Sequence, residues 1–349
     1  MNRPHSSGQA RPTAAHGHSA ERRRLLGGTA AMAAVGLAPA GVRANETQLG
    51  VVAFPGPSIS AHSKVVIKKN ELDRKRGWNL RWETRPTSDA YYNDFVNGAY
   101  ESIDLGGLNI FANLHNKGVP LKLVQASVRW PTPLVVRTAS GIRSVGELKG
   151  KKVAVGRASF AFAFLTGTLR NASLDLEKDT ELSNVDFFQA LPRLRRGDFD
   201  AAVLLFEHAI QLLAEQPNDY AILCDTGAEF ARFLGVRSAL NYQAVRNDWL
   251  DKNPGGIDKV IATYRDSAEF FAKRAPEAVK QLALPLDQQG ANLNERVGTV
   301  AYVTGTAAGL KTEWVARPVA DLKADIQREL EAYRSLGLIE RLPAASFYL

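Results

Sequence analysis

The sequence is poor in the residues that metal sites and many catalytic centres require. It holds a single cysteine, Cys224, among 349 residues, which excludes internal disulfides and any cluster of cysteine ligands around a metal. Beyond residue 44 it has three histidines, His62, His115 and His208, and no two of them stand at the spacing of a metal-binding pair. We therefore expect no metal site and no other cofactor.

Motifs of the common catalytic and nucleotide-binding folds are also missing. The chain has no Gly-x-Ser-x-Gly turn, no P-loop and no glycine-rich dinucleotide fingerprint. These absences argue against an enzyme and favour a binding protein.

The basic excess of the chain lies mostly at its beginning. The sequence has 44 Lys+Arg against 36 Asp+Glu, but the first 44 residues contain six arginines and one glutamate. The remainder has 38 basic against 35 acidic residues, an excess too small to indicate a nucleic-acid partner. Its roughly 305 residues suit two medium-sized domains.

The first 44 residues have the pattern of an export signal. The twin arginines Arg22 and Arg23 precede a Gly/Ala-rich, modestly apolar run that ends near Ala40, and small residues before Ala44 predict cleavage after it. A general secretory signal is the alternative, whereas a membrane anchor would need about 20 strongly apolar residues. Either route predicts a periplasmic protein that is soluble after signal removal.

Strands and helices alternate between Val145 and Glu207. Lys152–Val155 and Ala201–Leu205 have the pattern of strands, and Phe160–Asn171 that of a helix with Ser159 at its N-cap position. This alternation builds a parallel sheet, whose carboxyl edge is where α/β proteins bind small ligands.

The same alternation recurs before this stretch, and helices dominate after it. The expected strands are Leu49–Phe54, Leu80–Thr84, Ile103–Leu105, Lys122–Ala126 and a return strand near Val236–Ala244. The expected helices are Ile59–Arg76, Ser88–Gly98 with Ser88 as its cap, Leu108–Asn116, Ile257–Lys273, Pro276–Ala283 and Asp321–Leu336.

Three phrases carry a resemblance to a known family. The run Leu148–Val155 (Leu-Lys-Gly-Lys-Lys-Val-Ala-Val) comes first, then the helix start at Ser159, then Gly197–Ala202 (Gly-Asp-Phe-Asp-Ala-Ala). The order resembles the substrate-binding proteins of ABC importers in the nitrate, sulfonate and taurine branch, with the related thiamine-precursor binders. The turn Gly106-Gly107 and the later Gly118–Leu121 (Gly-Val-Pro-Leu) resemble a further stretch of that family.

The resemblance implies a type II periplasmic-binding-protein-like α/β fold, with two lobes, a ligand cleft and a two-strand hinge. Residues 45–130 and 238–349 would form lobe 1, and residues 131–237 lobe 2. The implied function is a monomeric receptor that closes around a small organic anion, foremost a sulfonate or taurine, and presents it to a membrane permease. A pyrimidine thiamine precursor, an aromatic carboxylate and an enzyme on the same fold are alternatives. A desulfinase of this fold needs a cysteine after the first strand, where this chain has Pro55–Ser58.

The candidate ligand contacts lie at strand ends, at helix starts and at the first crossing between lobes. Serines at helix starts sit beside backbone N–H groups that suit an anion, although each is also a simple cap. Arginines could pair with an anion or be solvated, and Trp130 could stack on a ligand or pack the hinge. Glu207 favours a zwitterionic or hydroxylated ligand, or points to solvent. The full set is Pro57, Ser58, Arg85, Gly106, Gly107, Leu108, Arg129, Trp130, Ser159, Phe160, Glu207 and His208.

Overall fold

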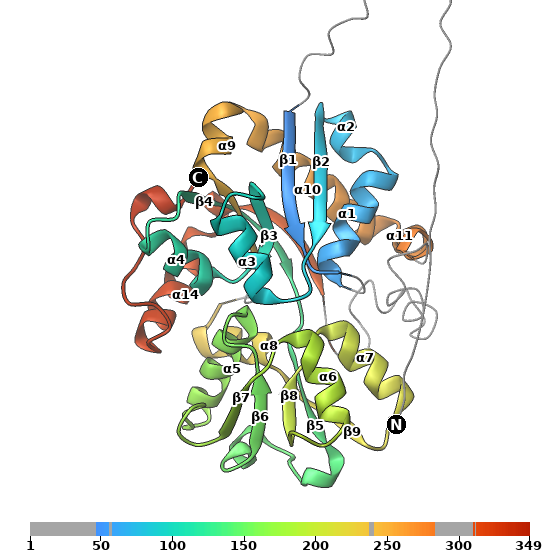
Figure 1. The fold of residues 1–349 in the computed structure, drawn as a ribbon, viewed down its shortest axis with the longest axis vertical. Helices are drawn as coiled ribbons and strands as arrows, with labels where there is room; N and C mark the ends of the chain where they lie inside the picture. The colour runs from blue at the N-terminus through green and yellow to red at the C-terminus, as the bar shows by residue number, and fades with distance from the viewer. Residues whose placement is uncertain (1–46, 56–57, 237–240, 283–309, 311) are drawn as a thin grey trace, which may run out of the picture. The chain divides into compact units, whose positions relative to one another are not determined.

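The computed structural model describes residues 47–55, 58–236, 241–282, 310 and 312–349, and Asn45–Leu349 form one compact unit. The strands of the described residues make two separate sheets. We call the part built on the first sheet lobe 1 and the part built on the second sheet lobe 2 (Figure 1).

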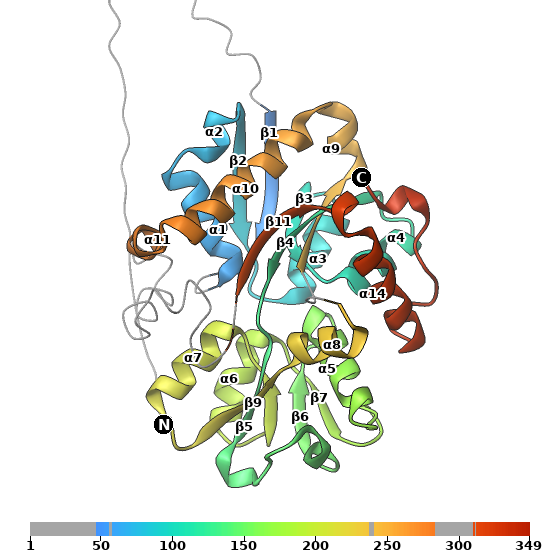
Figure 2. The same ribbon diagram turned by 180° about the vertical axis from the view of Figure 1, so that it is seen from behind.

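The sheet of lobe 1 has six strands in the order β11-β4-β10-β3-β1-β2. β1 pairs in parallel with β2 and β3, whereas β10 runs antiparallel to both β3 and β4. Figure 2 shows β11 beside β4, its antiparallel partner. The strands are β1 (Thr47–Ala53), β2 (Trp78–Thr84), β3 (Ser102–Gly106), β4 (Leu121–Arg129), β10 (Asn241–Arg246) and β11 (Glu313–Pro318).

Helices cover both faces of this sheet. α1, α9 and α10 supply apolar side chains to one face, and α3, α4 and α14 to the other. The run Leu49–Ala53 of β1 is buried throughout, as expected of a parallel strand covered on both faces. The helices are α1 (Ile59–Lys69), α2 (Leu72–Lys75), α3 (Ser88–Val96), α4 (Leu108–Asn116), α9 (Asn247–Lys252), α10 (Gly256–Lys273), α11 (Ala275–Leu282) and α14 (Lys323–Ser335).

The sheet of lobe 2 has five strands in the order β7-β6-β8-β5-β9. β6 is parallel to β7 and β8, and β5 is antiparallel to β8 and β9. α6 and α7 pack on one face, and α5 and α8 on the other. The strands are β5 (Pro133–Arg137), β6 (Lys152–Val155), β7 (Glu181–Asn184), β8 (Ala201–Val203) and β9 (Tyr220–Asp225), and the helices are α5 (Phe160–Asn171), α6 (Phe187–Arg195), α7 (Phe206–Glu215) and α8 (Thr226–Leu234).

The chain passes between the two sheets twice, as the two-lobed fold class predicts. The first passage lies between the end of β4 at Arg129 and the start of β5 at Pro133. The second lies between α8 and β10, where residues 237–240 are outside the described part of the chain. The α/β class with two lobes is confirmed, while the lobe boundaries at residues 130 and 238 stay predictions.

Two local predictions are wrong. The helix expected over Ile59–Arg76 is two helices, because Glu71 takes a left-handed conformation (φ 52°) and Asn70 donates its side-chain N–H to the carbonyl of Val66 (2.8 Å). The cap of α3 is Thr87, whose hydroxyl accepts a hydrogen bond from the N–H of Ala90, and not Ser88.

Candidate functional site

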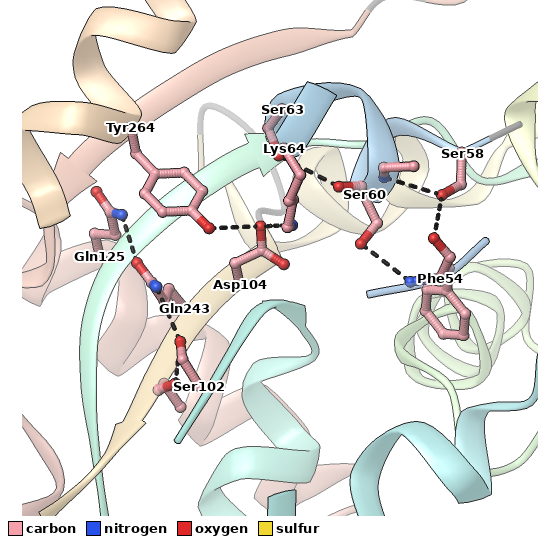
Figure 3. Close-up of polar contacts among 12 residues, drawn as sticks. Phe54, Ser58, Ser60, Ser63, Lys64, Ser102, Asp104, Gln125, Gln243 and Tyr264 are labelled. Carbon is pink, nitrogen blue, oxygen red and sulfur yellow. Dashed lines mark hydrogen bonds and ion pairs between the residues drawn. The ribbon is translucent and has the colours of Figure 1, made fainter. Parts of the chain in front are cut away.

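The start of α1 is held by a chain of serine hydroxyls that follows β1. Ser58 is the N-cap, and its Oγ accepts from the N–H of Ala61 (3.3 Å) and donates to the carbonyl of Phe54 (3.1 Å). The Phe54 N–H donates in turn to the Oγ of Ser60 (3.2 Å), as Figure 3 shows. These bonds fix the amino end of α1 at the carboxyl edge of the sheet. The preceding candidate, Pro57, lies outside the described residues.

Glu207 of lobe 2 occupies the amino end of this lobe 1 helix. Its Oε1 accepts a hydrogen bond of 2.7 Å from the N–H of Ile59, the first residue of α1. Glu207 stands in the first turn of α7 and is fully buried. The carboxylate therefore sits where the sequence placed the anionic group of a ligand, and of its two proposed orientations the one toward solvent is wrong.

A second carboxylate that sequence reasoning missed repeats this arrangement. Asp186 of lobe 2 accepts from the N–H of Ser88, the first residue of α3, over 2.9 Å. Its other oxygen accepts from the N–H of Phe188 (3.4 Å), so Asp186 also caps its own helix α6. An aspartate before an apolar helix is a recognisable N-cap signal, but no local pattern shows that it faces Ser88.

The Gly106-Gly107 turn brings the lobes into direct contact. A Cβ on Gly106 would lie 2.1 Å from the ring of Phe111, and one on Gly107 would lie 2.8 Å from the Cβ of Phe160 in lobe 2. The Gly107 N–H donates to the hydroxyl of Tyr92 (3.1 Å). Only glycine fits at either position, because neighbouring side chains already fill the space that a Cβ would take. Leu108 follows as the first residue of α4 and is fully buried.

Aromatic rings from both lobes meet around Trp130. Its ring centroid lies 6.4 Å from that of Phe54 in lobe 1 and 5.8 Å from that of Phe160 in lobe 2. Phe54 also stacks on Tyr91 (4.4 Å) and contacts Phe188 of lobe 2 (6.0 Å). We call Phe54, Tyr91, Trp130, Phe160 and Phe188 the interlobe aromatic cluster.

Several buried polar atoms near this cluster have no hydrogen-bonding partner among the described residues. Among them are the Nε1 of Trp130, the Oγ of Ser88 and the Oδ1 of Asn109. The three residues are 2%, 2% and 5% exposed, so water reaches them poorly. A buried polar group without a partner costs roughly 1–3 kcal/mol, and a bound solute with matching donors and acceptors would remove that cost.

The two arginines proposed for an anion are each paired with a carboxylate. Arg129 bonds through Nη2 to the Oδ2 of Asp225, which also caps α8. Arg85 bonds through Nε to the Oδ2 of Asp94 at 2.6 Å and lies over the ring of Tyr100. Their part in ligand binding stays a prediction, and a ligand anion would have to compete with these carboxylates.

Ser159 and His208, the remaining candidates, are buried in lobe 2. Ser159 stands at the N-cap position of α5, but its hydroxyl donates to the carbonyl of Gly156 (2.6 Å) and makes no capping bond. His208 packs edge-on against Phe188, and burial lowers the pKa of His208 to about 4, so the imidazole is neutral at pH 7. Neither residue supplies a positive charge for an anion.

A buried charged network joins α1, β3 and α10. Lys64 of α1 donates to the Oδ2 of Asp104 in β3, and the hydroxyl of Tyr264 donates to the same oxygen over 3.2 Å (Figure 3). Lys64 is fully buried and Asp104 is 1% exposed. Burial lowers the pKa of Lys64, and the Asp104 charge opposes that shift.

The described residues contain no group of three or more His, Cys, Asp or Glu side chains that could hold a metal ion. In the same part of the chain, no helix is both long enough and apolar enough to cross a membrane.

Cys224 of β9 is largely buried, and burial, with Glu229 and Asp225 nearby, raises the pKa of its thiol to about 12. A thiol that stays protonated at pH 7 is a poor nucleophile.

The sequence of residues 107–278 matches the family model described as NMT1/THI5 like. This part of the chain is similar in sequence to the NMT1/THI5-like family. The matched segment runs from the glycine turn through all of lobe 2 and back to the helices of lobe 1. No curated protein matches the sequence.

Solved structures with the same fold include two binding proteins and an enzyme. The alkanesulfonate-binding protein SsuA from Xanthomonas axonopodis pv. citri, bound to MOPS, aligns with a TM-score of 0.66 at 17% identity, over 87% of this chain and 98% of that chain. The nitrate-binding protein NrtA from Synechocystis PCC 6803 gives 0.63 at 12%, over 86% and 83%. The desulfurization enzyme DSZB gives 0.59 at 14%, over 85% and 94%.

Together, the family model and these folds confirm the resemblance found in the sequence. At such identities the likeness of the structures concerns the fold alone.

Proposed function

We propose that this protein is an exported receptor that captures a small organic solute between two lobes and delivers it to the membrane permease of an ABC importer. The family match and the two-lobed fold support the receptor role. The twin-arginine signal at Arg22 and Arg23, with cleavage after Ala44, supplies the route to the periplasm. The receptor acts as a monomer.

The observation that carries this proposal is the junction of the lobes. Both lobes contribute aromatic rings to the interlobe cluster, and the Nε1 of the buried Trp130 is an unused donor there. The lobes touch at Gly107 and Phe160, so a solute enters only when they separate. Opening and closing about two chain passages is the hinge motion of two-lobed receptors.

The same junction favours one ligand class among those that the sequence left open. A sulfonate or taurine, the leading candidate, would need an anion position, but Glu207 holds the start of α1 and Asp225 holds Arg129. A flat organic solute could stack on the aromatic cluster and accept a hydrogen bond from Trp130. We therefore place a pyrimidine ahead of an aliphatic sulfonate and of an aromatic carboxylate, since both of these are anions.

A binding screen with one matched pair of variants tests this proposal. The purified mature protein is titrated in a thermal-shift assay with taurine, nitrate, benzoate-type carboxylates and aminopyrimidines. A solute at 100 times its dissociation constant stabilises the fold by about 2.7 kcal/mol, enough for a shift of several degrees. Calorimetry with the best solute then compares Trp130→Phe with Trp82→Phe, a half-buried tryptophan of the edge strand β2.

We expect Trp130→Phe to weaken binding by about tenfold, through the loss of one buried hydrogen bond, and Trp82→Phe to leave it unchanged. Equal affinities of the two variants would place the solute elsewhere.

An enzyme remains the second candidate because DSZB shares the fold. Turnover of an aromatic sulfinate without stable binding of any solute in the panel would overturn the receptor role.

A further inference from the structure

Helices of the two lobes face each other with their amino ends at two places, and one carboxylate lies at each place. α1 of lobe 1 meets the start of α7 at Glu207, and α3 of lobe 1 meets the start of α6 at Asp186. Both carboxylates belong to lobe 2, and each accepts from the first backbone N–H of a lobe 1 helix. The two contacts have the same construction although they share no residue.

Electrostatics gives these carboxylates a definite role. The amino end of a helix carries a partial positive charge of about half an electron, so two facing ends repel each other. A carboxylate between them attracts both, and a hydrogen bond from N–H to an ionised oxygen is about twice as strong as a neutral one. Glu207 is fully buried, which reduces screening by solvent. The negative charge of each side chain therefore stabilises the closed arrangement of the lobes.

We propose that Glu207 and Asp186 are built-in anions that hold the lobes together and bar anionic solutes from the starts of α1 and α3. A free sulfonate, sulfate or nitrate at either helix would have to displace a carboxylate already tethered to lobe 2. The tether gives the carboxylate a high effective concentration, which a dissolved anion cannot match. The two residues act as specificity determinants of the receptor, and this selectivity rests on the function proposed above.

Isosteric neutral variants test the inference in two independent ways. Glu207→Gln, Asp186→Asn and the double variant keep side-chain volume and a carbonyl acceptor but lose the charge. The matched control is Asp198→Asn, which removes a lobe 2 aspartate that is paired with Arg193 and Arg196 at the surface. Circular dichroism first establishes that each variant is folded.

The first readout is amide hydrogen exchange without any added solute. We expect the N–H of Ile59 to exchange about tenfold faster or more in Glu207→Gln. The N–H of Ser88 should do the same in Asp186→Asn. Exchange should stay at the wild-type rate in Asp198→Asn. Unchanged exchange at both amides in the double variant would show that the carboxylates do not hold the lobes, and would overturn the proposal.

The second readout is calorimetric titration with taurine and with sulfate. We expect the wild type to show no binding at the highest solute concentration tested, and the double variant to bind at least one of the two solutes with a dissociation constant about tenfold or more below that concentration. Tight binding of taurine by the wild type would overturn the selectivity. Because amide exchange needs no physiological solute, a failure of the receptor proposal leaves that result interpretable by itself.

Discussion

Replacing Glu329 by Gln should remove a large pH dependence of stability. Glu329 of α14 is 2% exposed and lies between two phenols, since Tyr242 donates to its Oε2 (3.2 Å) and Tyr333 to its Oε1. Burial raises the pKa of Glu329 from 4.5 to about 7, the two hydroxyls oppose the shift, and the charge of Asp325 adds to it. The folded protein thus keeps a proton that the unfolded chain releases.

The sign and size of the effect follow from this difference in proton binding. Below pH 4.5 the stabilisation by the raised pKa is fully present, and it is lost as the pH rises to about 7. At 1.36 kcal/mol for each unit of pKa, this loss amounts to about 3 kcal/mol of the free energy of unfolding. Gln keeps an acceptor for the phenols but has no proton to lose.

Urea unfolding of the wild type and Glu329→Gln, at intervals from pH 5 to pH 8, measures the effect. Burial lowers the pKa of His62 to about 3 and that of His208 to about 4, so these residues stabilise the fold as the pH rises toward 6.5. Both proteins share that trend, and the difference between them isolates Glu329. Between pH 5 and pH 8, we expect the free energy of unfolding of Glu329→Gln to rise by about 2–3 kcal/mol relative to that of the wild type. Parallel curves would refute the buried titration.

Two further substitutions test the core and the export route. Lys64→Met should cost about 3–5 kcal/mol in urea unfolding, because it leaves the buried Asp104 uncompensated, and adding Asp104→Asn should recover part of that loss; a cost below 1 kcal/mol would contradict a buried ion pair. Changing Arg22 and Arg23 to Lys should trap the precursor in the cytoplasm, and an unchanged periplasmic yield would indicate the general secretory route.

The bounds of three elements were predicted correctly from the sequence. The helices Leu108–Asn116 and Phe160–Asn171 and the strand Lys152–Val155 have the bounds expected from the sequence. The helix after β1 was predicted too long although Asn70, which bonds the carbonyl of Val66, is a recognised helix stop. Asn70 also bonds Gln281, 211 residues away. Such a contact leaves no local trace in the sequence.

The candidate site was also predictable only in part. Sequence patterns located Ser58, Gly107, Trp130, Phe160 and Glu207, and the structure brings all five to the junction of the lobes. The patterns could not show which group each charged side chain bonds. Glu207 meets an amide 148 residues away, and Arg129 meets a carboxylate 96 residues away. A charged residue at a strand end looks available for a ligand until its partner is known.

This pairing changes how the junction can recognise a solute. The groups that could bind an anion are already occupied by carboxylates of the protein: Arg129 bonds Asp225, and the start of α1 bonds Glu207. Three uncharged groups near the aromatic rings, namely an indole N–H, a hydroxyl and an amide oxygen, have no hydrogen-bonding partner among the described residues. Recognition by such groups depends on shape, stacking and neutral hydrogen bonds. Affinity for the physiological solute should therefore change little with ionic strength, whereas anion binding gained by removing Glu207 and Asp186 should weaken as salt is added.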